Sequence, residues 1–178
     1  MKSMYLIAGA RPNFMKIEFL KKLIGFAAIL IIAFFLVGVF AGWQATQARF
    51  NVDALGRMIQ AYQVSEGKTI ESLADLPDFE VISSSDGLAA KSADLKKMIC
   101  FGYSYDLQYL GKGQYVVSAS PVGWFNSGYE FGITQKQEMK ANRKNPDAQA
   151  DSYDEVTRWR SIPRYEHVRT KILSEYLR

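Results

Sequence analysis

The sequence predicts an α+β protein in which one long N-terminal helix packs on a small antiparallel sheet and is followed by a C-terminal helical extension. Residues 23–43 contain no charged side chain. Apolar residues then recur every three or four positions as far as about residue 65, which is the period of a helix. From residue 100 the period changes to two, as in a strand. A chain of 178 residues has room for one compact domain and an anchor.

The uncharged run Leu23–Trp43 is the clearest feature of the chain. Crossing a hydrocarbon core of about 30 Å takes about 20 apolar residues, and a cleaved secretory signal has a shorter apolar stretch. We therefore expect a retained transmembrane helix over 23–43. The charges before it are Lys2, Arg11, Lys16, Lys21 and Lys22, opposed by Glu18. By the positive-inside rule, residues 1–22 are a cytoplasmic leader and the chain after the span lies outside the cytoplasm.

Within this run, Gly38 and Gly42 form a G-x-x-x-G pair. This spacing lets two membrane helices approach closely, so the pair is a candidate for helix packing. Glycine is also common in membrane helices without any such role.

An apolar stripe continues the helix beyond the membrane segment. It is formed by Val52, Leu55, Ile59 and Tyr62. One helix from about Leu23 to Ser65 is predicted, apolar all round in its first half and amphipathic in its second, with Gly67 as its stop. Thr69 is then placed to cap a short helix over 70–76 that ends at Pro77.

Alternating residues predict strands over 103–109, 115–119 and 129–133. The turn between the first two is Gly111–Gly113, and residues 135–138 form the exit turn of the third. We expect a meander of three or four strands. Its apolar face needs a cover, and the amphipathic half of the long helix is the nearest one available.

The last part of the chain, 143–178, is predicted to hold a linker and helices. Residues 140–151 are polar and turn-rich. Ser152 and Glu155 have the spacing of a capping box, which starts a helix through Trp159. A final amphipathic helix is indicated by Tyr165, Val168, Ile172 and Tyr176.

The composition argues against a catalytic site or a metal site. Cys100 and His167 are the only cysteine and histidine and lie far apart, so neither a Cys/His nucleophilic pair nor a histidine-rich metal site is expected. Cys100 lies in an apolar run and is expected to be a buried small hydrophobe, whereas His167 is expected on the surface of a helix. No catalytic motif is present, so we expect no enzyme and no cofactor.

The distribution of charged residues does not indicate a ligand either. Lys and Arg total 22 and Asp and Glu 18, spread along the chain, so no nucleic-acid partner is expected. The acidic residues Asp147, Asp151 and Asp154 form a loop of a kind that can bind calcium. Their spacing lacks the central glycine of an EF-hand, and a solvated loop is the simpler interpretation.

Residues 16–139 resemble the pilin-like proteins, which comprise type IV pilins and the pseudopilins of type II secretion. The matching features are the basic leader Lys16–Lys22, Gly25-Phe26 opening an apolar run, and the stretch AYQVSEGKTIESL between helix and sheet. GQYVVSASPVGWFNSGYEFGITQKQEM is similar to the family's final strands. The resemblance implies that 44–142 is a pilin-like domain.

The same resemblance implies a role in an envelope secretion or pilus machine, in the inner membrane, with other pilin-like subunits as partners. It makes Gly25 and Phe26 the processing site. Leu23 and Ile24 separate this site from the lysines, and Leu30 stands where the family usually has the Glu that pairs with a neighbouring subunit. The missing Glu favours an accessory subunit over a major one. A membrane-tethered binding module unrelated to pilins is the alternative.

Residues 5–17 on their own resemble the opening strand and loop of the non-hydrolysing UDP-N-acetylglucosamine 2-epimerases. The chain is about half as long as two such lobes require, and a membrane segment follows. A sugar-nucleotide enzyme is therefore the least favoured hypothesis. Because Met15 opens a conventional short basic leader, translation is expected to start there rather than at Met1.

Overall fold

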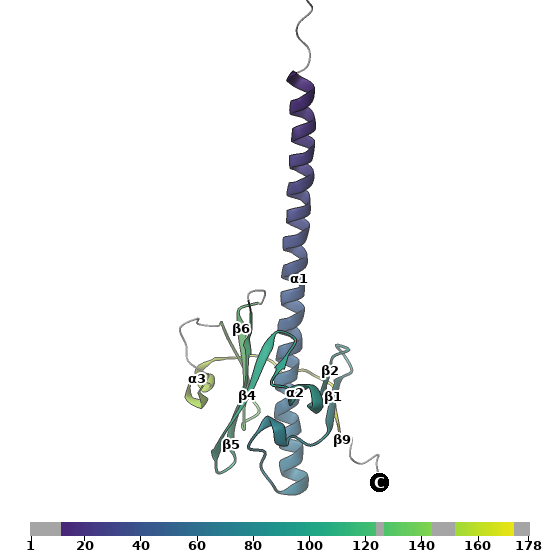
Figure 1. Cartoon of the computed structure of the whole chain (residues 1–178). Helices are drawn as coiled ribbons and strands as arrows, with labels where there is room; N and C mark the ends of the chain where they lie inside the picture. The colour runs from purple at the N-terminus through teal and green to yellow at the C-terminus, as the bar shows by residue number, and fades with distance from the viewer. Residues whose placement is uncertain (1–11, 124–126, 144–151, 173–178) are drawn as a thin grey trace, which may run out of the picture. The chain divides into compact units, whose positions relative to one another are not determined.

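The structure, a computed structural model, describes residues 12–123, 127–143 and 152–172. The chain divides into two compact units, Met1–Val39 and Phe40–Arg178; the second is called the sheet domain below. Helix α1 (Pro12–Glu66) belongs to both units (Figure 1). It ends as predicted at Gly67, whose φ of 65° suits glycine and whose N–H bonds the Gln63 carbonyl at 3.1 Å.

The described residues of the sheet domain form two antiparallel sheets rather than one. Six strands form the larger sheet, in the order in which the chain visits them. They are β3 (Ile99–Cys100), β4 (Tyr103–Gly111), β5 (Gln114–Pro121), β6 (Tyr129–Thr134), β7 (Met139–Arg143) and β8 (Arg160–Ser161). The smaller sheet has the order β2-β1-β9, with β1 (Phe79–Ser83), β2 (Ala89–Lys91) and β9 (Val168–Ile172).

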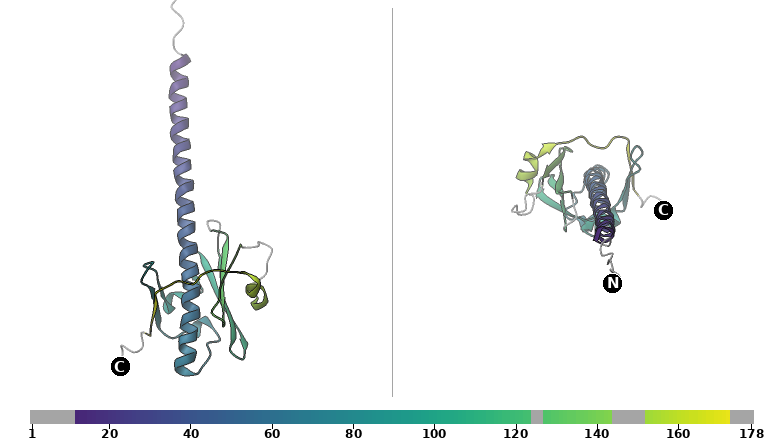
Figure 2. Two further views of the ribbon diagram at one scale, coloured as in Figure 1. Left: turned by 180° about the vertical axis from the view of Figure 1, so that it is seen from behind. Right: turned by 90° about the horizontal axis from the view of Figure 1, so that it is seen from above.

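The part of α1 that belongs to the sheet domain lies between the two sheets (Figure 2). Its apolar stripe is buried as the sequence predicts, because Val52, Leu55 and Ile59 have no exposed surface. Tyr62, the last member of the stripe, is half-buried. The core that they enter includes Phe79 and Val81 of the smaller sheet, and Tyr103, Tyr115, Val117 and Ile133 of the larger one.

The three predicted strands are present as β4, β5 and β6, and the 111–113 turn joins the first two. The expected count of three or four strands is wrong. β3 and β8 have only two residues each, too few to show a period in the sequence. Residues 140–143 belong to the polar stretch predicted as a linker or surface loop, but they form β7 with Met139 and pair with β6.

Strand β7 was not predicted because its sequence is mostly polar. Its only strongly apolar member is Met139. Lys140 is buried, and its ammonium group donates to Ser161 Oγ at 2.8 Å.

The predicted helix after Ser152 is confirmed as α3 (Tyr153–Arg158), with Ser152 Oγ accepting from the Glu155 N–H at 3.3 Å. The predicted final amphipathic helix is wrong, because β9 pairs with β1 from Val168 to Ile172. Val168 and Ile172 are four residues apart, a spacing that places side chains on one face of a helix or of a strand. The segment is a strand because the free edge of β1 provides hydrogen-bond partners for it.

Two short helices connect the remaining elements. The helix expected over 70–76 is reduced to the 3-10 turn η1 (Leu73–Asp75), and its cap is Ser72 rather than Thr69. Helix α2 (Ser92–Leu95) follows β2, and Ser92 Oγ accepts from the Phe79 N–H at 3.0 Å. This bond ties α2 to the start of β1.

Candidate functional site

Residues 23–40 of α1 present apolar side chains on every face. Every side chain from Ile17 to Phe40 is exposed, and Phe34 has 82% of its surface accessible. Within the described residues, α1 is the one helix long and apolar enough to cross a membrane. A helix that is hydrophobic all round and not covered by protein is suited to lipid. The arrangement is consistent with a single-pass membrane anchor near the N-terminus.

The sequence-predicted site residues all lie on α1. Phe26 is exposed, and a Cβ built on Gly25, Gly38 or Gly42 would meet no described atom within 4 Å. No close packing within the described part of the chain therefore requires glycine at these three positions. Whatever role they have, it does not come from contacts with the described part of this chain.

The second half of α1 differs because it carries buried polar residues. Gln47 Nε2 donates to the Ala89 carbonyl of β2 and to Asn51 Oδ1, at 3.1 Å each. Asn51 Nδ2 donates to the Tyr105 hydroxyl of β4 at 2.9 Å. Burial raises the pKa of Tyr105 above its ordinary value. These bonds connect the helix to both sheets through buried side chains.

A buried carboxylate lies at the centre of the domain. Asp53, fully buried on α1, accepts from Arg57 Nε at 3.2 Å and from Arg164 Nε. Arg57 lies one helical turn away, whereas Arg164 lies in the segment between β8 and β9. Two guanidinium groups on one buried carboxylate provide the charge pairing that burial demands.

Arg164 also extends the network into the larger sheet. Its Nη1 donates to Gln137 Oε1 at 2.9 Å. Gln137 Nε2 donates to the Tyr115 hydroxyl at 2.6 Å and to the Gly56 carbonyl at 3.2 Å. Burial raises the pKa of Tyr115 to about 12.

Residues 162–167, called the strap below, pass from the larger sheet to the smaller one across α1 (Figure 2). Arg49 Nη2 donates to the Pro163 carbonyl at 2.6 Å, and its guanidinium lies 4.7 Å from the centre of the Tyr165 ring. The Tyr165 hydroxyl donates to the Thr46 carbonyl at 3.2 Å. Arg49, Asp53 and Arg57, spaced by four, thus hold the strap along one face of the helix.

The hydrogen bonds of Asp53 and Arg164 connect α1, the strap and the larger sheet. Cys100 is half-buried, and burial first, with the charge of Asp94 second, raises the pKa of its thiol, which leaves less thiolate at neutral pH. His167 is exposed as expected, in a turn with φ 50° rather than on a helix. Among the described residues, no group of three or more His, Cys, Asp or Glu side chains is placed to hold a metal ion.

Of the acidic loop considered for calcium, Asp147 and Asp151 lie outside the described residues, and Asp154 lies in the first turn of α3. Residues 5–11 of the epimerase-like stretch also lie outside them.

Sequence reasoning did not find the network around Asp53. A signal was present, because Asp53 lies beside the apolar stripe with arginines four residues before and after it. Nothing in the sequence indicates Arg164, which is 111 residues from Asp53. No model of a known protein family, no curated protein and no solved structure compared with this chain matches it.

Proposed function

We propose that this chain is a membrane-anchored, pilin-like structural or accessory subunit of an envelope secretion or pilus machine. The main support is helix α1: its first half is exposed and apolar, and its second half is the central element of an antiparallel domain. Together with the sequence resemblance over 16–139, this favours a scaffolding role. The proposal includes no catalytic step and no cofactor.

The proposed location is the inner membrane, with the N-terminus in the cytoplasm and the sheet domain outside it. The charge asymmetry around 23–43 supports this orientation. The proposed partners are the membrane and other pilin-like subunits. Leu30, in place of the family's usual Glu, favours an accessory member over the main building block of a filament.

Processing provides the experiment. We expect N-terminal sequencing of the native protein to find a mature terminus at Phe26. Gly25→Leu should then abolish processing, and Gly38→Leu should leave it intact. The two variants are matched, since a side chain at either position meets no described atom of this chain within 4 Å.

A tethered binding module, the second candidate, is favoured by the same Leu30, because the subunit-pairing carboxylate is absent. An unprocessed chain that stays monomeric in the membrane would support this candidate against the pilin-like one.

Orientation needs its own test. Protease added outside spheroplasts should digest the chain after Gln44 while leaving the leader intact. Full protection of the sheet domain in intact spheroplasts would contradict the proposed orientation.

A further inference from the structure

Exposed large apolar side chains of the sheet domain gather at one end of it. Within the described part of the domain, the members of this cluster, called the apolar belt below, are Phe40, Trp43, Met98, Ile99, Phe101, Val122 and Tyr129. The other exposed large apolar residues, Val64, Ile82 and Leu110, belong to three different elements. Single exposed apolar residues are ordinary, but a contiguous group marks an interaction surface.

The belt joins helix and sheet through stacked rings. Phe40 and Trp43 of α1 stack with their ring centres 5.9 Å apart. Phe101, in the turn between β3 and β4, meets the Trp43 ring edge-on at 5.2 Å. Val122 is held beside the same turn, because its N–H donates to the Gly102 carbonyl at 2.8 Å.

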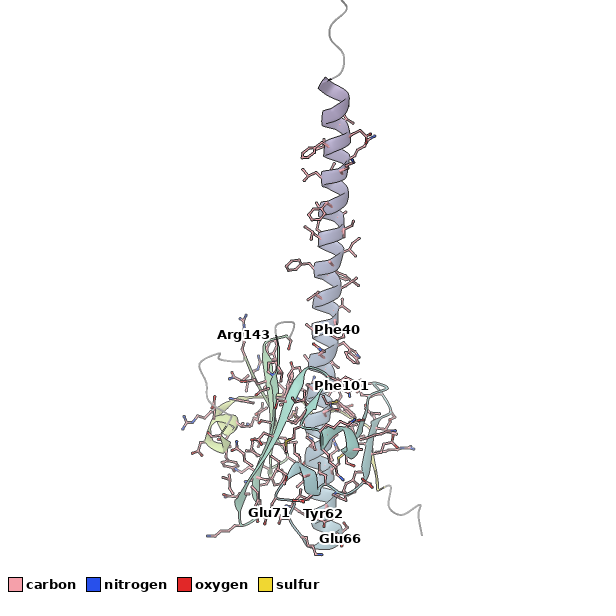
Figure 3. All side chains as sticks on the ribbon, viewed as in Figure 1. Phe40, Tyr62, Glu66, Glu71, Phe101 and Arg143 are labelled. Carbon is pink, nitrogen blue, oxygen red and sulfur yellow. The ribbon has the colours of Figure 1, made fainter. Side chains whose placement is uncertain are left out.

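The belt lies at the end of the domain where α1 enters it. Strand β4 runs alongside the helix, since Gly102 abuts Gln44 and the Tyr105 hydroxyl bonds Asn51. Phe40, Phe101 and Arg143 accordingly lie at one end of the domain, and Tyr62, Glu66 and Glu71 at the other (Figure 3).

The β3–β4 turn is shaped to expose apolar side chains. Phe101 in this turn has a φ of 51°, and Met98, just before β3, has a φ of 60°; both lie in the left-handed region that residues with a Cβ seldom adopt. Gly102 follows with φ 74°, and a Cβ there would lie 2.6 Å from Gln44 Nε2. A turn facing water would favour polar residues such as Asn or Asp in this conformation.

We propose that the apolar belt is a membrane-contact surface and that the β3–β4 turn inserts into the boundary between lipid headgroups and acyl chains. This rests on the proposed membrane anchor. The uncharged run ends at Trp43, so the bilayer surface is expected near that residue, where aromatic side chains collect in membrane proteins. Arg143, exposed at the end of β7, adds a cation that can reach lipid phosphates.

Spin labels on the full chain, reconstituted into phosphatidylcholine vesicles, test the proposal. Cys100 is the only cysteine, so Cys100→Ser provides a cysteine-free background. Ile99→Cys places a label in the belt, and Leu110→Cys places the matched control at the far end of β4, with exposures of 61% and 51% in the parent side chains. Phe34→Cys reports on the anchor. Collisions with oxygen and with a water-soluble nickel complex measure the depth of each label.

The label at position 99 is expected to collide with nickel several-fold less often than the label at 110, and with oxygen more often. Val122→Cys, directly after β5, should agree with position 99. It is the control for any disturbance of β3 pairing by the label at 99. Equal nickel access at 99, 110 and 122, with position 34 protected, would overturn the belt but leave the anchor intact. Nickel access at position 34 would overturn the anchor, and the belt proposal with it.

Discussion

The two halves of helix α1 share one secondary structure but differ in what covers them. From Ile17 to Phe40 every described side chain is exposed, whereas Val52, Leu55 and Ile59 are completely buried. After the charged residues Glu18, Lys21 and Lys22, the rest of this first half, 23–40, is apolar on all faces. The second half carries Gln47, Asn51 and Asp53 in the interior, each hydrogen-bonded to a side chain or a carbonyl group.

This difference shows that the surroundings of a helix determine which polar residues it can carry. A lipid environment provides no partner for a carboxylate, so an all-apolar surface suits the first half. A folded domain can provide partners, and the two arginines on Asp53 do so.

The largest effect is expected at Asp53. Asp53→Ala leaves the Arg164 guanidinium in the strap without its carboxylate, and breaking a buried ion pair in this way costs about 3–5 kcal/mol. The midpoint of urea unfolding of the full chain in detergent, followed by near-ultraviolet circular dichroism, should fall sharply. Asp106→Ala, at an exposed position, is the control and should change it little. Equal midpoints for the two variants would contradict a structural role for the Asp53 network.

Truncating side chains of the apolar stripe should lower the stability of the sheet domain, whereas truncation in the first half of α1 should not. Leu55→Ala and Ile59→Ala each remove a fully buried side chain and should cost about 2–5 kcal/mol of unfolding free energy. Gln60→Ala on the exposed face of the same half should be nearly neutral. Phe34→Ala in the first half should likewise leave the domain's unfolding midpoint in place. An unchanged midpoint for both Leu55→Ala and Ile59→Ala would mean that the helix does not stabilise the sheets.

A further variant introduces a carboxylate into the first half of α1. Ile31→Asp should raise the apparent free energy of membrane insertion by about 2.5–3.5 kcal/mol, because an ionised side chain near the centre of a span has no partner. An insertion assay with glycosylation sites on either side of 23–43 measures the change. Ile31→Val is the control and should insert like the parent chain. Unchanged insertion of the aspartate variant would indicate that this segment does not lie in lipid.

Alkaline pH should destabilise the sheet domain but not the uncharged segment 23–43. The pKa of Tyr115 is raised to about 12 in the folded protein, against about 10 when unfolded. The fold therefore favours the neutral phenol, and this contribution is complete below pH 10 and decreases as the pH rises to about 12. By linkage it amounts to about 2–3 kcal/mol.

Unfolding midpoints measured between pH 9 and 12 test this expectation. Tyr115→Phe should flatten the pH dependence, while Tyr129→Phe, at an exposed position, should retain it. Equal slopes for the two variants would assign the alkaline loss of stability to other groups, such as the buried Tyr105.

Much of the framework was predictable from local sequence. The end of α1 at Gly67, the strands β4, β5 and β6, and the cap at Ser152 each follow from a short-range signal. The burial of the apolar stripe followed from the need of a sheet for a cover. The network around Asp53 was not predictable, since Gln137 and Arg164 reach it from other elements.

The sequence by itself determined the end of the long helix, its division into an uncharged and an amphipathic half, and the central hairpin, because all three depend on periodicity and turn chemistry within a few neighbouring residues. The predicted start of the helix near Leu23 is wrong, because α1 begins at Pro12. Only the tertiary structure decided the rest. The segment Val168–Ile172 fits a helix or a strand by its spacing, and it is a strand because the edge of β1 supplies its hydrogen bonds. Asp53 can be buried because the strap brings Arg164 to it, a pairing between distant residues that no local pattern specifies.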